Sequence, residues 1–341
     1  MATITEIAQK TNVSIATVSR VLNYDKSLSI TEEKRKLILE TAENLDYQTP
    51  KRKKMNLKKP LTIGLIHWYT MHQELEDTYY LSIRLGVERT CYDRHIELVK
   101  IFKTQDAYQL DNIKNLDGVI AVGKFSKEDI QLFEEKFPII VFVDSSPDEI
   151  KYDSVVIDFK QAFTKAIDYI LSLGHEKIGY IGGREYIGKD QEALGEQREI
   201  VFREYLTSKG LFDEKNVHIG SFTIESGYEL MKIAIDQNHL PTAFMIASDG
   251  MAIGLLKACY EAGIRIPKDL SIFSFNDITQ SQYTIPPLST VKVYKEFMGE
   301  QAVNLFIEKA THQRTISKKI IIPTELVIRE SCSPLLKKET L

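Results

Sequence analysis

The spacing of apolar and polar positions changes character near residue 60. Before this point apolar residues recur at helical spacing in short segments, and after it short apolar runs alternate with longer amphipathic segments. Apolar positions three and four apart share one face of a helix, whereas apolar runs of about 4–8 residues are typical of buried strands. The sequence therefore predicts a small helical head followed by a larger body that mixes strands and helices.

Three short helices are predicted in the head. Thr3 can cap the first, and the Glu6 side chain can return a hydrogen bond to the Thr3 backbone, which is a capping box. Ser14 is placed to cap the second helix, and Thr31 the third, which closes the unit near Tyr47. Facing apolar positions are expected to form a shared core from Ile7, Ala8, Val13, Val18, Val21, Leu22, Ile38, Ala42 and Leu45.

The first two helices, separated by a tight turn, form a helix-turn-helix, a unit that places its second helix in the major groove of DNA. Residues 1–60 carry 12 Lys and Arg against 7 Asp and Glu, a net charge of +5. The remainder carries 32 against 41, a net charge of −9, which together give the −4 of the whole chain. Because a basic segment attracts polyanions, DNA is the first predicted partner of the head.

The body repeats a pattern of strand followed by helix. Strands are predicted at 61–66, 97–102, 116–122, 139–143, 154–157, 178–181, 243–247 and 271–275, and helices at 80–94, 127–136, 161–173, 192–209 and 251–262. This alternation predicts parallel, doubly wound sheets, and its restart near residue 160 predicts two similar α/β lobes. Such sheets bind ligands beyond the carboxyl ends of their strands, so the predicted ligand site is a cleft between the lobes.

The domain boundaries follow from these patterns, because 341 residues exceed the length of one ordinary domain. The head is assigned to 1–47, a basic linker bracketed by prolines to 48–60, and the body to 61–341. Within the body, the first lobe is expected at approximately 61–159 plus 291–321, and the second at approximately 160–290 plus 322–341.

Cysteine use and hydropathy exclude several classes of protein. Cys91, Cys259 and Cys332 are an odd number at wide spacing without a CxxC pair, so neither disulfides nor a metal site is predicted. No segment reaches the roughly 20 apolar residues of a membrane span, and the first residues form an amphipathic helix instead of a signal peptide. We expect a cytoplasmic protein without a membrane partner, metal or cofactor.

Motifs along nearly the whole chain resemble the LacI/GalR family of bacterial transcription repressors. They lie at residues 5–8, 13–14, 17–23 and 45–47 of the head, and at 173–183, 198, 247–254, 274–277 and 286–291 of the body. Residues 67–80 further resemble galactose-operon repressors. The resemblance implies a body like that of periplasmic binding proteins, a homodimer on double-stranded operator DNA, and allosteric control by a small sugar, galactose or a relative, bound between the lobes.

The resemblance places Ile15, Ala16 and Arg20 at base-reading positions of the second helix. Arginine can donate two hydrogen bonds to guanine O6 and N7, whereas apolar side chains contact a thymine methyl group. For an isolated arginine, solvation of an exposed helix face would be the better explanation, but the register of Arg20 on the capped second helix favours the DNA role. For Ser14 the capping role alone is a sufficient explanation, and a contact with a DNA phosphate is secondary. The further candidate DNA contacts are Ser14, Thr17, Ser19 and Asn23.

The linker departs from the family pattern. Many members carry an alanine-rich hinge helix that orders on the operator and inserts a leucine into the minor groove, whereas this chain has a basic run at residues 51–54. Met55 or Leu57 could serve as the inserted wedge. A flexible basic tether that contacts phosphates is the other interpretation, and both remain open.

A sugar presents hydroxyl groups around an apolar ring face, so its site needs polar groups beside an aromatic side chain. By the resemblance, Arg198, Asp144 and Asn276 would bind hydroxyls, and Phe222 or Trp68 would stack on the ring. The full set of candidate effector contacts is Trp68, Tyr69, Asp144, Arg198, Phe222, Ser248, Asp249 and Asn276.

Several of these candidates also have structural explanations. Phe222 can belong to the core, Asp249 can cap the helix after it, and Arg198 can pair with Glu196 or Glu199. Asp77, Tyr79 and Tyr80 can reach the ligand or simply begin a helix. His175 lies in a helix-to-strand turn, where a structural role is expected.

Enzyme motifs do not occur in the sequence. Asp190 follows a glycine and a lysine where a phosphate loop needs Ser or Thr, and neither GxGxxG after a strand, GxSxG nor HExxH is found. Two other functions remain open, a global regulator with a phosphorylated protein as corepressor and a sugar-binding transport receptor, although the receptor would need a signal peptide and no basic head. Whether the sugar releases the operator or acts as a corepressor also remains open. Residues 335–341 are too short for a tetramer-forming coiled coil.

Overall fold

The computed structural model describes residues 3–22, 28, 30–45, 60–70, 73–74, 78–103, 107–111, 113, 115–188, 192–237, 239–312 and 314–335. The chain divides into two compact units, Met1–Pro60 and Leu61–Leu341. Several residues singled out from the sequence lie outside the described residues: Asn23, Tyr47, Met55, Leu57, Asp77 and Asp190.

The head contains helices α1 (Ile4–Thr11), α2 (Ile15–Leu22) and α3 (Glu32–Asn44). The predicted capping box is confirmed, because Thr3 Oγ1 accepts from the Glu6 backbone N–H at 3.3 Å and Glu6 Oε2 accepts from the Thr3 N–H at 2.8 Å. Ser14 Oγ accepts from the Thr17 N–H at 3.1 Å, as expected of a cap. The buried core of the head is made by Ile7, Ala8, Val18, Val21, Ile38 and Ala42.

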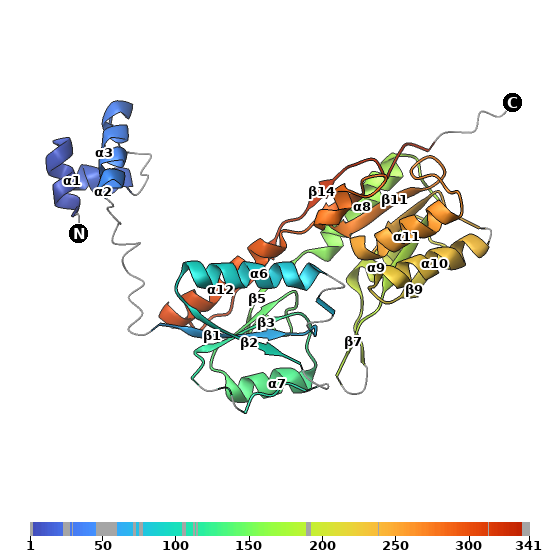
Figure 1. Cartoon of the computed structure of the whole chain (residues 1–341), viewed down its shortest axis with the longest axis horizontal. Helices are drawn as coiled ribbons and strands as arrows, with labels where there is room; N and C mark the ends of the chain where they lie inside the picture. Colours follow the sequence, from blue (N-terminus) through green and yellow to red (C-terminus); the bar gives the residue numbers. More distant parts are fainter. Residues whose placement is uncertain are drawn as a thin grey trace. The chain divides into compact units, whose positions relative to one another are not determined.

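The first lobe is a parallel sheet with helices on both faces. Its strands are β1 (Thr62–His67), β2 (Glu97–Phe102), β3 (Gly118–Val122), β4 (Ile140–Val143), β5 (Asp153–Ile157) and β13 (Lys319–Ile322), in the order β13-β5-β4-β3-β1-β2. Helices α6 (Thr78–Asp93) and α12 (Lys295–His312) cover one face, and α7 (Lys127–Lys136) covers the other (Figure 1). Gly86 allows α6 and α12 to touch, because a Cβ atom there would lie 2.1 Å from the Glu296 carbonyl oxygen.

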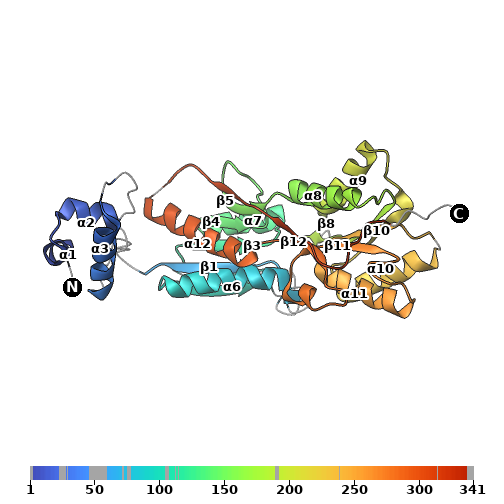
Figure 2. The same cartoon turned by 90° about the horizontal axis from the view of Figure 1, so that it is seen from above.

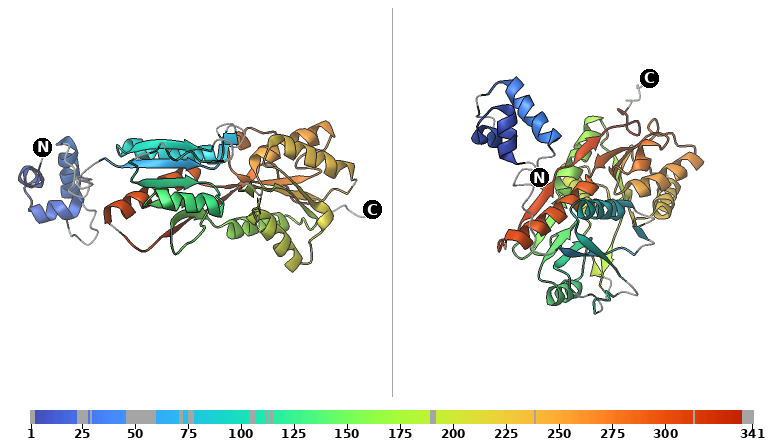
Figure 3. Two further views of the ribbon diagram at one scale, coloured as in Figure 1. Left: turned by 90° about the horizontal axis from the view of Figure 1, so that it is seen from below. Right: turned by 60° about the vertical axis from the view of Figure 1, so that its left-hand side comes forward.

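The second lobe repeats this architecture. Its strands are β6 (Ile178–Gly183), β9 (Val217–Gly220), β10 (Ala243–Ile246), β11 (Ser271–Asn276), β12 (Ser289–Lys292) and β14 (Glu325–Val327), in the order β14-β12-β11-β10-β6-β9. All neighbours are parallel except β14, which pairs antiparallel with β12. Helices α8 (Phe159–Ser172) and α9 (Gln197–Ser208) lie on one face, and α10 (Ile224–Asp236) and α11 (Asp249–Glu261) on the other (Figures 2 and 3). Two short 3₁₀ helices, η1 (Glu214–Asn216) and η2 (Thr279–Gln282), complete the lobe.

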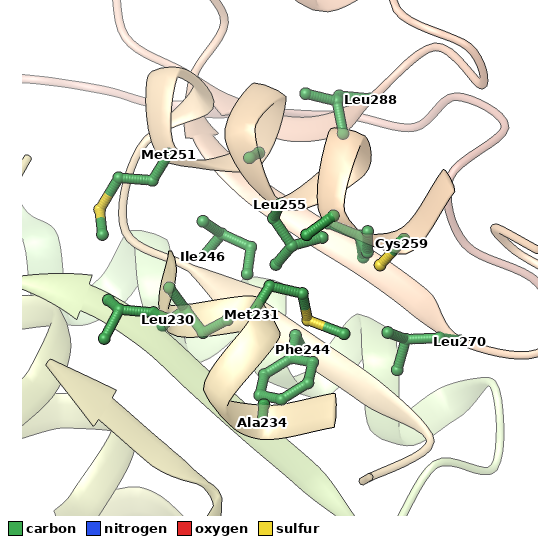
Figure 4. Packing of buried hydrophobic residues seen from close by; sticks show 14 residues of the cluster. Leu230, Met231, Ala234, Phe244, Ile246, Met251, Leu255, Cys259, Leu270 and Leu288 are labelled. Carbon is green, nitrogen blue, oxygen red and sulfur yellow. The ribbon is translucent and has the colours of Figure 1, made fainter. Parts of the chain in front are cut away.

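The core of the second lobe lies between its sheet and the helices α10 and α11 (Figure 4). Phe244 and Ile246 project from β10 against Met231 of α10 and Leu255 of α11, and all four side chains are fully buried. Burying a side chain of this size contributes about 1.5–3 kcal/mol. This packing fixes the strand ends that carry the polar residues of the site.

One predicted helix begins in the wrong place. Residues 192–193, expected to start a helix, form strand β8 (Glu192–Ala193), which pairs with β7 (Tyr186–Ile187) in a hairpin. The helix α9 begins only at Gln197, because the Glu196 side chain caps it by accepting from the Glu199 N–H at 2.9 Å. Figure 1 shows the hairpin projecting from the second sheet.

The chain passes three times between the lobes, after β5, after β12 and after β13. The second passage follows Lys292, so Val291 and Lys292 lie in the second lobe although the sequence assigned them to the first. The helices α10 and α12 and the strands β9, β12, β13 and β14 were not among the predicted elements. No described helix is long and apolar enough to cross a membrane.

Candidate functional site

Polar side chains at the carboxyl ends of both sheets meet in a pocket between the lobes. The first lobe contributes Lys124 after β3 and Asp144 after β4, and the second contributes Ser248 after β10 and Asn276 at the end of β11. The described residues that line it are Tyr79, Tyr80, Lys124, Asp144, Phe159, Glu185, Arg198, Phe222, Ser248 and Asn276. The volume is about 20 Å³, enough for one water molecule, so a larger ligand enters only when the lining side chains or the lobes move.

Asp144 is held by two tyrosines of α6. The hydroxyl of Tyr79 donates to Asp144 Oδ1, and that of Tyr80 donates to Oδ2, each at 2.8 Å. Burial raises the pKa of Asp144, although the nearby Lys124 and the two hydroxyl groups act in the opposite direction. The backbone at Asp144 adopts a left-handed φ of 67°, which Asp tolerates better than most residues. The carboxylate is therefore a fixed acceptor at the pocket wall.

Arg198 lies at the centre of the second-lobe wall. Its Nε donates to Glu196 Oε1 at 2.6 Å, and its Nη1 donates to the Ala247 carbonyl at 2.6 Å. The guanidinium carbon also lies 5.0–5.3 Å from the ring centroids of Phe159, Phe222 and Phe275. Burial alone would lower the pKa of Arg198, but the Glu196 carboxylate outweighs it and the net pKa is raised, so the side chain stays cationic. The predicted pairing with Glu196 is thus confirmed, and Arg198 lines the pocket as well.

A second charge pair joins the two lobes directly. Lys124 Nζ in the first lobe lies 2.7 Å from Glu185 Oε2 in the second, and Tyr69 donates its hydroxyl to Glu185 Oε1 at 3.1 Å. Lys124 also lies 5.6 Å from the Trp68 ring. Lys124, Glu185 and Phe159 were not predicted from the sequence. Lys124 and Phe159 each lie two residues after the end of a predicted strand, which is the only sequence signal for them, and Glu185 has none.

Asp249 does not line the pocket. Ser248, and not Asp249, caps α11 by accepting from the Met251 N–H at 3.3 Å. The Asp249 carboxylate is fully buried and accepts hydrogen bonds from Ser281, Thr290 and the Ile278 backbone. These contacts join α11 to the loop after β11, and they support the structural explanation of Asp249 that the sequence also allowed.

Trp68 and Tyr69 lie behind the pocket wall. Both pack edge-on or tilted against Tyr80, with ring centroids 5.7 and 4.7 Å away, and neither belongs to the lining. They support Tyr80, which is the tyrosine that holds Asp144. Phe222 and Asn276 do line the pocket, and the Asn276 carbonyl accepts from Lys295 Nζ at 2.5 Å.

Other polar groups in the body have structural roles. His175 contacts the Thr242 hydroxyl at 3.0 Å and the Ser333 carbonyl at 2.9 Å, as expected for a turn histidine. Within the described part of the chain, no group of three or more His, Cys, Asp or Glu residues could hold a metal ion.

Helix α2 of the head buries one face and exposes the other. Val18 and Val21 are buried in the head core, whereas Ile15, Ala16 and Arg20 are exposed. The remaining described DNA candidates are exposed or half-buried on the same short segment: Ser14, Thr17 and Ser19. The predicted base-reading side chains therefore stand on the solvent face of the second helix, which is the face that could enter a groove.

Comparison with known proteins decides the family. Residues 3–50 match the model of bacterial regulatory proteins of the lacI family, and residues 167–332 match a periplasmic binding protein-like domain. The HTH-type transcriptional repressor MelR of Bacillus subtilis (strain 168) is 40% identical over 100% of both chains. The chain belongs to the LacI family of bacterial transcription regulators. It is accordingly a DNA-binding regulator and not an enzyme, and its helix-turn-helix is the DNA-binding unit.

Further relatives and solved structures agree with this membership. The HTH-type transcriptional regulator GalR of Streptococcus thermophilus is 36% identical over 97% of this chain and 99% of its own. A putative transcriptional regulator LacI from Bacillus cereus subsp. cytotoxis has a TM-score of 0.70 at 25% identity, covering 82% of this chain and 100% of that one. The complex of the transcriptional regulator CelR with cellobiose has a TM-score of 0.68 at 24% identity, covering 97% and 100%, and shows the same fold.

Proposed function

We propose that this LacI-family protein is a homodimeric repressor of a sugar-utilisation operon. Its binding to the operator is controlled by galactose or a galactoside bound between the two lobes. Binding of the sugar favours a lobe arrangement in which the two heads no longer fit their half-sites, so the operator is released. The preference for galactose rests on the resemblance of residues 67–80 to galactose-operon repressors.

The pocket between the lobes carries the proposal. Asp144 and Asn276 provide acceptors and donors for hydroxyl groups, and Phe159 and Phe222 provide apolar faces for a pyranose ring. Among the similar folds, CelR is described in complex with cellobiose and another LacI-family regulator with bound ribose. A sugar is thus the ligand class that this lining fits best.

The charges in the pocket favour a neutral sugar. Arg198 is paired with Glu196, and Lys124 is paired with Glu185. An anionic ligand would have to compete with a carboxylate for each cation, at the cost of leaving that carboxylate without its partner in a largely buried site. Neutral hydroxyl groups can instead add hydrogen bonds to pairs that stay intact.

The test is release of the operator by sugar. The full chain would be bound to a labelled fragment of its own upstream DNA, and the complex titrated with galactose, glucose and galactosides while fluorescence anisotropy is recorded. The Asp144→Asn variant keeps the shape of the side chain but replaces one acceptor oxygen by an amide donor. We expect about tenfold more sugar to be needed for half-release, which corresponds to about 1.4 kcal/mol.

The control is Asp158→Asn, because Asp158 caps α8 outside the pocket and Asn caps equally well. This variant should respond to sugar like the natural protein. The proposed function would be wrong if no sugar in the panel weakened the operator complex, or if Asp144→Asn and Asp158→Asn released DNA at the same sugar concentration.

A further inference from the structure

The small pocket adjoins a larger chamber between the lobes. Lys124, Asp144 and Phe159 belong to the lining of both, so the two spaces share a wall. The chamber has a volume of about 500 Å³, which lies within the about 300–1,000 Å³ of small-molecule sites, against about 20 Å³ for the inner pocket. Most of the space available to a ligand is therefore on the outer side of the shared residues.

The chamber has the chemistry of a second sugar-binding position. Phe125 and Ile130 of the first lobe give it apolar walls, and the hydroxyl groups of Ser145 and Ser146 and the amide of Gln197 give it polar ones. The Ser145 hydroxyl donates to the Gly123 carbonyl at 2.6 Å, which leaves its oxygen able to accept from a ligand. An amide such as that of Gln197 can both donate and accept. Apolar faces beside hydroxyl-binding groups suit a sugar ring.

The chamber offers no unpaired cation to an anionic ligand, and its lining also carries the carboxylates of Asp144 and Glu196. Its two lysines are paired, Lys124 with Glu185 at 2.7 Å and Lys319 with Glu149 at 3.2 Å. A phosphate or carboxylate on the outer part of the ligand would have to break one of these pairs. The outer part of the ligand is therefore expected to be neutral.

We propose that the effector is a neutral sugar of two linked rings, with one ring against the shared residues at the inner pocket and the second ring in the outer chamber. This inference rests on the proposed function and narrows its ligand class from a sugar to a disaccharide. A single ring at the shared residues would leave most of the chamber to water. A second ring would exchange that water for contacts with Phe125, Ile130 and Gln197.

The test compares one ring with two by isothermal titration calorimetry on the full chain. The probes are galactose, the α-1,6- and β-1,4-linked disaccharides of galactose and glucose, and galactose 6-phosphate. We expect at least one disaccharide to bind about tenfold or more tightly than galactose, a difference of about 1.4 kcal/mol. Galactose 6-phosphate should bind no more tightly than galactose.

Substitution at Gln197 locates the second ring. Gln197 is the exposed first residue of α9, so Gln197→Trp fills the chamber without disturbing the core. It should weaken the disaccharide about tenfold while changing galactose affinity less than about twofold. Gln161→Trp, at an exposed first-turn position of α8 outside both linings, is the control and should change neither.

Each outcome separates this inference from the function on which it rests. If galactose releases the operator and binds as tightly as every disaccharide, the two-ring ligand is wrong and the proposed function stands. The same holds if Gln197→Trp weakens galactose and disaccharide equally, or if galactose 6-phosphate binds most tightly. If no sugar binds or releases the operator, the proposed function fails and the inference fails with it.

Discussion

Glu185 on the second lobe lies 2.7 Å from Lys124 on the first, and both side chains also line the pocket between the lobes. Glu185 directly precedes β7 of the hairpin, and Lys124 lies two residues after the end of β3 in the first lobe. Because this ion pair bridges the lobes and also lines the ligand site, it can couple binding of a ligand to the arrangement of the lobes. A sugar that reaches this pair changes the contacts that hold the lobes together.

This coupling predicts a measurable interaction energy. In a double-mutant cycle with Lys124→Met and Glu185→Gln, the free energies of unfolding should deviate from additivity by about 0.5–3 kcal/mol, as expected of residues in direct contact. The matched control is the exposed pair Lys257 and Glu261 on α11, for which about 0.3–0.5 kcal/mol is expected. The values come from urea unfolding of the natural protein, the two single variants and the double variant of each pair. Strict additivity at Lys124 and Glu185 would show that the bridge does not hold the lobes.

The head gives a prediction about sequence recognition. Arg20 stands on the exposed face of α2, and its replacement by Ala should weaken operator binding by about 1–3 kcal/mol if the guanidinium reads a base. Binding to unrelated DNA should change much less, since that affinity depends on phosphates. Lys36→Ala, on the exposed face of α3, is the control. Equal losses of Arg20→Ala on operator and unrelated DNA, measured by anisotropy, would assign Arg20 to the phosphate backbone.

The second lobe exposes an apolar surface suited to a second copy of the chain. Ile285 is 94% exposed beside the exposed Tyr283 and Tyr260, in a groove of about 760 Å³. Exposed apolar clusters often mark interfaces, and a homodimer needs one. Ile285→Asp should shift the protein toward monomers in sedimentation velocity and weaken operator binding. Ile150→Asp, at an 86% exposed position in the first lobe, should leave the dimer intact. Unchanged sedimentation of Ile285→Asp would place the interface elsewhere.

Three buried histidines make the stability of the body depend on pH. Burial lowers the pKa of His67, His175 and His218 below the ordinary 6.5. As the pH falls through 6.5, these histidines therefore bind protons in the unfolded chain but not in the folded protein. Their contribution to the free energy of unfolding is fully present above pH 6.5 and is lost as the pH drops below it. Each proton contributes at most about 1.4 kcal/mol per pH unit.

The measurement is the free energy of unfolding between about pH 7.5 and about pH 5.5. His67→Gln should flatten the decrease, because this imidazole is 1% exposed and its burial lowers its pKa more than the neighbouring Glu74 raises it. His239→Gln, at an exposed position, should keep the slope of the natural protein. Asp144 has the opposite effect on stability, because burial raises its pKa above the ordinary 3.8. As the pH rises above 3.8, the unfolded chain loses this proton more readily than the folded protein, so the contribution of Asp144 to stability decreases. A slope that His67→Gln leaves unchanged would contradict the assignment.

The local parts of the fold were predictable because their causes are local. Thr3 and Ser14 cap their helices through atoms three residues away, so sequence spacing alone indicates the contact. The strand pattern predicted that a ligand site lies beyond the carboxyl ends of the strands. The resemblance to the family singled out Asp144, Asn276 and Arg198.

The remaining site residues depend on contacts that sequence spacing does not show. Glu185 meets Lys124 across 61 residues of sequence, through a hairpin whose two-residue strands look like the start of a helix. Asp249 follows a strand as a ligand contact would, but three donors from distant segments use its carboxylate. For Glu185 a contact between the two lobes decides the role of the residue, and for Asp249 contacts between distant segments of the second lobe decide it.

The central claim is that the ligand site between the lobes and the DNA-binding head are linked, and reciprocal linkage tests it most directly. The affinity of the full chain for its effector sugar would be measured by calorimetry with and without saturating operator DNA. If the sugar weakens operator binding by some factor, the operator must weaken sugar binding by the same factor. We predict a sugar dissociation constant that rises about 5–150-fold when the operator is bound, the usual range of allosteric coupling. An identical dissociation constant with and without operator would contradict the account.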